Sequence, residues 1–180
     1  MWISFAMLGA IGMLSTNFST TLPLFVSDAL HKSDREFTLL YSVFSFGAVI
    51  GALFIARRDT VRIRDIIFGA LLLGLTMLLL SVAPGVGTAA VAVFFVGLAS
   101  ILYLTPTLSI VQVEAGREMH GRVSSFQAVL MGGTQLIGGP LSGWLADALG
   151  GRAPFLFGGI GCFLCAMWGF FATRNQREKR

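Results

Sequence analysis

Few side chains in the long apolar runs of this sequence could do chemistry, and almost all of them are amides or hydroxyls. Six of them that fall well inside these runs are Asn17, Tyr103, Thr105, Gln127, Thr134 and Gln135. Amides and hydroxyls donate and accept hydrogen bonds without carrying a charge at neutral pH. They suit the binding of a small molecule that has both polar and apolar parts. We therefore predict that these residues line a substrate cavity, with Asn17, Gln127 and Gln135 facing it. Hydrogen bonding between helices is the alternative.

Residues that usually bind metals or act as nucleophiles form no such pattern here. His31 and His120 lie in polar segments, and neither falls within an apolar run. Cys162 and Cys165 make a C-x-x-C inside an apolar run, with no second pair of ligands. A membrane-embedded hydrolase would need a nucleophile with a base, or a cluster of histidine and acid. We expect no metal site, no bound cofactor and no enzymatic activity.

Charged residues fall in clusters that leave long uncharged runs between them. Only 12% of the 180 residues are charged and 55% are apolar, whereas soluble domains carry about a quarter charged residues. Each run reaches the roughly 20 residues that a helix needs to cross a bilayer, and the longest, 66–113, is divided by a Pro-Gly turn at 84–87. The sequence therefore predicts an all-α polytopic membrane protein, with residues 1–180 forming one bundle of six transmembrane helices. The expected spans are 2–27, 37–56, 65–83, 88–113, 122–146 and 153–173.

The distribution of Lys and Arg predicts the orientation in the membrane. Ten of the thirteen fall on one side when both termini are placed in the cytoplasm, which is the bias that cytoplasmic loops show. The net charge of +4 is thus a topology signal, and no nucleic-acid partner is inferred from it. Small residues at four-residue spacing, Gly47 with Gly51 and Gly139 with Gly143, indicate faces where membrane helices pack closely, with Pro140 bending the second of these helices.

One segment resembles a motif of the major facilitator superfamily, whose members carry G-P-x-x-G-x-L-A-D-x-x-G-x-R where a helix ends and a short loop leads to the next. The matching residues are Gly139, Pro140, Gly143, Leu145, Ala146, Asp147, Gly150 and Arg152. The stretch that opens with Gly121 and Arg122 is similar to the preceding cytoplasmic loop. "NFSTTLPLF" and "GALFIARRDTVRIR" resemble further family segments, although Arg57, Arg58 and Asp59 reverse the acid-before-base order of the second.

The resemblance implies helices seven to twelve of a twelve-helix carrier from the branch of drug and siderophore exporters similar to the enterobactin and macrolide carriers. It implies export of an amphiphilic small molecule by alternating access across a bacterial inner membrane, driven by an ion gradient. An N-terminal six-helix half or a second copy is the expected partner, together with the lipid bilayer. No ionisable residue lies near the middle of a span, so a coupling acid is expected in that partner half.

The resemblance also gives roles to charged residues of the loops, each with a simpler alternative. Asp147 and Arg152 are expected to pair and shape the outer loop, or to be solvated charges. Arg122 is expected to bind helix ends or lipid phosphate at the inner gate, or to be an ordinary cytoplasmic anchor. The loop with Arg57, Arg58 and Asp59 is the counterpart of a gating loop.

Two other functions are compatible with a six-helix membrane protein. The first is a half-protein that does not transport but associates with a partner membrane protein through its polar face. The second is the membrane domain of another transporter class, such as an ATP-driven exporter. The second fits less well, because the loops of about 4 to 10 residues are shorter than the long helical extensions that such domains use.

Overall fold

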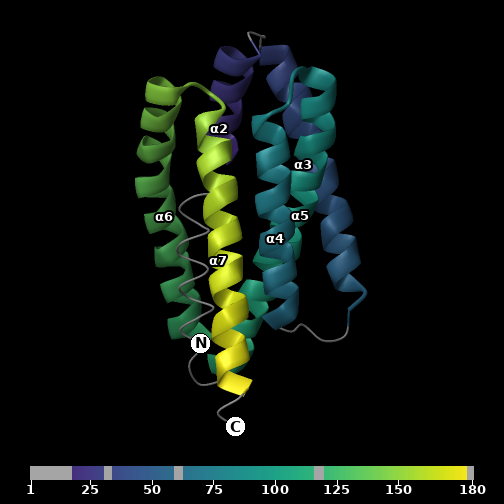
Figure 1. Cartoon of the computed structure of the whole chain (residues 1–180). Helices are drawn as coiled ribbons and strands as arrows, with labels where there is room; N and C mark the ends of the chain where they lie inside the picture. The colour runs from purple at the N-terminus through teal and green to yellow at the C-terminus, as the bar shows by residue number, and fades with distance from the viewer. Residues whose placement is uncertain (1–17, 31–33, 59–62, 116–119, 178–180) are drawn as a thin grey trace.

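The computed structural model describes residues 18–30, 34–58, 63–115 and 120–177, and nearly all of them are helical. The described elements are α2 (Phe18–Leu24), the π-helical turn η1 (Phe25–Ala29), α3 (Asp34–Ala56), α4 (Ile63–Ser81), α5 (Val86–Ala115), α6 (His120–Leu149) and α7 (Ala153–Arg177). This part of the chain contains no strand. The long helices stand side by side in a bundle whose turns lie at its two ends (Figure 1).

Among the described helices, four are long and apolar enough to cross a membrane. They are α3, α4, α5 and α7, with apolar stretches Arg35–Ala56, Ile63–Ser81, Val86–Ile110 and Ala153–Phe170. Helix α6 has 30 residues, but its glycines, serines, threonine and glutamines make it less apolar. Most of the first expected span falls in 1–17, outside the described residues. The helices α3 to α7 overlie the other five expected spans, and the count of six crossings stays a prediction.

Helices α3 and α5 pack with their backbones almost in contact. A Cβ atom added to Gly97 would lie 2.1 Å from the carbonyl oxygen of Phe44, and one added to Gly47 would lie 2.1 Å from that of Phe94. At Gly51 the nearest atom would be the Leu98 carbonyl oxygen, at 2.8 Å. Only glycine allows this approach, so the packing face predicted from Gly47 and Gly51 is confirmed.

Helix α4 lies between α5 and α7 and approaches both through glycines. A Cβ at Gly69 would lie 2.6 Å from the Leu102 carbonyl oxygen of α5. Gly74 of α4 and Gly159 of α7 face each other, since a Cβ on either would lie 2.9 Å from the carbonyl oxygen of the other. The continuous core follows these contacts and includes Leu73, Val93 and Cys162.

Aromatic side chains tie the short helix α2 to its neighbours. Phe18 of α2 stacks on Phe44 of α3 with ring centroids 4.5 Å apart, and it meets Phe155 of α7 edge to face at 5.6 Å. Phe25 of η1 meets the same Phe155 at 5.3 Å. Such pairs stabilise by about 0.5–1.5 kcal/mol each beyond their burial. They fix the end of α2 against the packed body of the bundle.

Helix α6 packs less closely on the other described helices than α3, α4, α5 and α7 pack on one another. Among the described residues, nothing lies within 4 Å of a Cβ added to Gly139 or Gly143. The close packing expected of this pair is therefore not made by any described helix. The spacing of Gly139 and Gly143 permits a close approach by another helix but does not determine which helix approaches. Here neither glycine contacts α3, α4, α5 or α7 closely.

Candidate functional site

The surface of α6 divides into three faces, which follow from its helical period. The face toward the bundle is buried: Val123, Gln127, Gly138, Ser142 and Ala146. A second face is apolar and exposed: Phe126, Val129, Ile137 and Trp144. A third face carries only small or polar residues, which are exposed except for the half-buried Gly139: Ser124, Ala128, Gly132, Gln135 and Gly139. We call this third face the small polar face.

Gln127 links α6 to α5 from the buried face. Its amide nitrogen donates to the Leu108 carbonyl oxygen at 3.4 Å, and the residue is 5% exposed. Tyr103 and Thr107 of α5 are also buried, and the Thr107 hydroxyl donates to the Tyr103 carbonyl oxygen at 2.6 Å. These groups hydrogen-bond within and between helices, which is the alternative that the sequence left open for Gln127.

The other cavity candidates lie at different depths. Gln135 is exposed on the small polar face, one residue from the half-buried Thr134, whose hydroxyl donates to the Met131 carbonyl oxygen within α6. Thr105 of α5 is half-buried. Asn17 falls outside the described residues. Of the six candidates, Gln135 is thus the described residue whose side chain is exposed.

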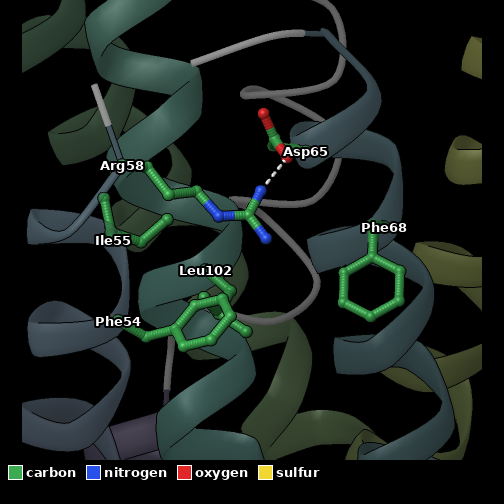
Figure 2. A pocket seen from close by; sticks show the side chains of 6 residues that line it. All are labelled: Phe54, Ile55, Arg58, Asp65, Phe68 and Leu102. Carbon is green, nitrogen blue, oxygen red and sulfur yellow. Dashed lines mark hydrogen bonds and ion pairs between the residues drawn. The ribbon is translucent and has the colours of Figure 1, made fainter. Parts of the chain in front are cut away.

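A cluster of charged and aromatic side chains joins the ends of α3 and α4. The Arg58 guanidinium, just beyond α3, is paired with the carboxylate of Asp65 in the first turn of α4, and both flank a small cavity with Phe68 (Figure 2). The Arg58 guanidinium also lies 5.1 Å from the centre of the Phe54 ring, in cation–π range. The negative charge of Asp65 also interacts favourably with the positive N-terminal end of the α4 dipole.

Asp65 is not predicted from the sequence, because Asp59 is the acid that directly follows the two arginines. Asp59 lies outside the described residues, and Arg57 is exposed. The missed signal is the acid in the first turn of the helix that follows a basic loop. The glycine contacts connect α3 and α4 indirectly, because Gly97 joins α3 to α5 and Gly69 joins α4 to α5. The cluster connects the ends of α3 and α4 directly.

A family model decides the class to which this bundle belongs. The model of the Major Facilitator Superfamily matches residues 4–180. The chain belongs to the major facilitator superfamily. No curated protein and no solved structure gives a significant match. Members of the superfamily are transporters rather than enzymes, so the chain has a transporter-type function in the general sense.

The segment at the α6–α7 turn that resembles a superfamily motif is held by contacts to backbone atoms. Gly150 has φ +91°, which favours glycine, and its amide donates to the Ala146 carbonyl oxygen to end α6. The Arg152 guanidinium donates to the Ala83 carbonyl oxygen at 3.1 Å, at the turn between α4 and α5. Among the described residues, no ion pair joins Arg152 to Asp147, so the expected pairing is replaced by this carbonyl contact.

At the opposite end of α6, Gly121 and Arg122 are exposed in the first turn. No described residue lies within 4 Å of a Cβ added to Gly121. No contact between Arg122 and another described residue supports either the gate role or the anchor role. Both roles stay predictions.

The pair of Arg58 and Asp65 is expected to couple the ends of α3 and α4 weakly. The two side chains are 43% and 20% exposed, and exposed pairs contribute about 0.2–1 kcal/mol because solvent screens them. A double-mutant cycle with Arg58→Gln and Asp65→Asn, measured by thermal unfolding in detergent, should give a coupling of about 0.5 kcal/mol. The coupling should shrink in high salt. Arg57→Gln serves as the control, and zero coupling at low salt would refute the pair.

Proposed function

We propose that this superfamily member forms one six-helix half of a secondary carrier that exports amphiphilic small molecules by alternating access. The observation that carries the proposal is the small polar face of α6, where Gln135 is exposed beside glycine, alanine and serine. An amide that faces hydrocarbon costs several kcal/mol, about 4–8 by transfer from water to an alkane. The separate apolar face of α6 is the one suited to lipid. The small polar face therefore suits water, substrate or the other half of a carrier.

The proposed carrier works by rocking one half against another around a site near the bilayer midplane. Gln135 would hydrogen-bond the polar part of a substrate, while the open glycines of the same face leave room for its apolar part. Gln127, held by the Leu108 carbonyl, would instead fix the position of α6. We further propose that the protein lies in a bacterial inner membrane with cytoplasmic termini and that an ion gradient drives export.

The partner proposed for the small polar face is a second six-helix bundle, either an N-terminal half or a second copy of this chain. Light scattering of the purified chain in detergent would distinguish these two partners, since pairing with a second copy doubles the protein mass and pairing with a separate N-terminal half does not occur in the purified chain. A monodisperse monomer that also captures no membrane partner would argue against both.

Replacing Gln135 by leucine should lower transport or change the substrate profile. Loss of one hydrogen bond to a substrate costs about 1–2 kcal/mol, or roughly tenfold in affinity for substrates that use it. Uptake of amphiphilic dyes into inside-out membrane vesicles that hold the complete carrier measures the effect, with and without an uncoupler. Val129→Leu, on the apolar face, is the matched control and should leave uptake unchanged. An unchanged rate and substrate profile in Gln135→Leu would remove the residue from the cavity.

A further inference from the structure

A groove with one cation lies between α4 and α7, at the end of the bundle where α6 turns into α7. Its volume is about 350 Å³, within the range of about 300–1,000 Å³ typical of ligand sites. It is lined by Ser81, Val82, Leu149, Arg152, Ala153, Leu156 and Phe157. Apart from Ser81 and Arg152 this lining is apolar, and Arg152 is its one charged residue.

The depth of the groove places it where lipid headgroups meet acyl chains. The apolar stretch of α4 ends at Ser81, and that of α7 begins at Ala153. Both residues line the groove, so its floor lies at the boundary of two apolar stretches. Arginine at this depth commonly extends its charged end to the interface while its stem stays on apolar surface.

The groove is also open to the surroundings of the bundle. Val82 and Leu149 are 65% and 62% exposed, and Leu156 and Phe157 are about two-fifths exposed. Large apolar side chains so exposed beside a crossing helix face lipid when the protein is in a membrane. A ligand that fills this groove must therefore combine an apolar chain with a group that complements the guanidinium.

The Arg152 side chain is held in place while it keeps donors for a ligand. One Nη2 hydrogen bond to the Ala83 carbonyl fixes it across the turns, and a guanidinium has five N–H donors. Within the described residues no carboxylate forms an ion pair with it, although Asp28 lies close to the neighbouring Gly151. A planar guanidinium binds phosphate through two parallel hydrogen bonds.

From these observations we propose that the groove binds one anionic phospholipid, with its phosphate on Arg152 and the start of one acyl chain on Val82, Leu156 and Phe157. Charge complementarity and depth select a lipid over a soluble anion, because only a lipid uses the apolar lining. The site would join the α4–α5 turn to the α6–α7 turn from outside. This site is independent of the transport proposal, because it requires only that the helices cross a membrane.

The test is native mass spectrometry of the full chain in detergent micelles doped with phosphatidylglycerol or phosphatidylcholine. The wild type should retain one phosphatidylglycerol in preference to phosphatidylcholine. Arg152→Gln should weaken that retention by about tenfold, the effect of losing a charge-assisted hydrogen bond. Arg35→Gln removes another exposed cation outside the groove, and should retain the lipid like the wild type. Equal retention by the wild type and Arg152→Gln would overturn the proposal.

A second variant separates a lipid from a headgroup anion alone. Leu156→Trp fills the groove but keeps Arg152 and its carbonyl contact, so it should reduce retention several-fold. If Leu156→Trp retains phosphatidylglycerol fully while Arg152→Gln loses it, or if inorganic phosphate displaces the lipid, the groove is not an acyl site and the proposal fails. If Arg152→Gln does not fold, the lipid preference of the wild type and its loss in Leu156→Trp decide the question.

Discussion

Gly97→Val is expected to separate α3 from α5 and to destabilise the whole bundle. The first carbon of any side chain at this position would lie 2.1 Å from the Phe44 carbonyl oxygen and 3.2 Å from the Ala48 amide nitrogen. Both atoms belong to the backbone of α3, so no side-chain rotation relieves the clash. We expect a loss of about 3 kcal/mol, the upper end of the range for overpacked interiors. For a chain of this length, that lowers Tm by about 6–12 °C.

The cysteines of the chain supply the measurement. Cys162 is fully buried in α7, and Cys165 is partly buried, so a thiol-reactive dye reports the temperature at which the core opens. Gly87→Val is the matched control, because it makes the same change in the same helix where no described atom lies within 4 Å. If Gly97→Val melts at the same temperature as Gly87→Val, the close contact of α3 and α5 is wrong.

The positions of the long described helices could be predicted from the sequence because charged clusters, and at 84–87 a Pro-Gly turn, mark the ends of the apolar runs. Expected spans such as 37–56 and 153–173 lie within α3 and α7. The pairing of helices could be predicted only in part. The Gly47 and Gly51 spacing identified a packing face, but nothing in the sequence showed that it meets Gly97 of α5. A small residue permits an approach from any helix, so the partner is set by the fold.

The residues of the candidate site could likewise be predicted only in part from the sequence. Amide and hydroxyl residues could be picked out as polar groups in apolar runs, but their depth could not. Gln127 and Gln135 lie eight residues apart in α6, yet one is buried against the Leu108 carbonyl and the other is exposed. The partner of Arg152 could not be predicted either, because it is the backbone carbonyl of Ala83, 69 residues away, and carbonyls leave no mark in a sequence.

Pro106 explains why one further glycine is needed in α4. Proline has no N–H, so the Leu102 carbonyl, four residues earlier in α5, lacks its helical donor. A Cβ on Gly69 would lie 2.6 Å from this oxygen and 2.7 Å from the Tyr103 amide nitrogen. The Cα–H of Gly69 that a side chain would replace therefore points at the freed carbonyl, in the arrangement of a weak C–H···O hydrogen bond.

Gly69→Ala is expected to push α4 away from α5 at this point, beside the buried Tyr103. The methyl group clashes with backbone and removes the C–H contact, so we expect a loss of about 2 kcal/mol, within the range for overpacking. Thiol-dye melting of the purified protein measures the loss.

Gly132→Ala, on the small polar face of α6, is the matched control. No described atom lies within 4 Å of its added methyl, and alanine favours a helix by about 1 kcal/mol over glycine. Gly132→Ala should therefore melt at or above the wild-type temperature. Equal melting of the two variants would mean that α4 does not approach the Leu102 carbonyl this closely.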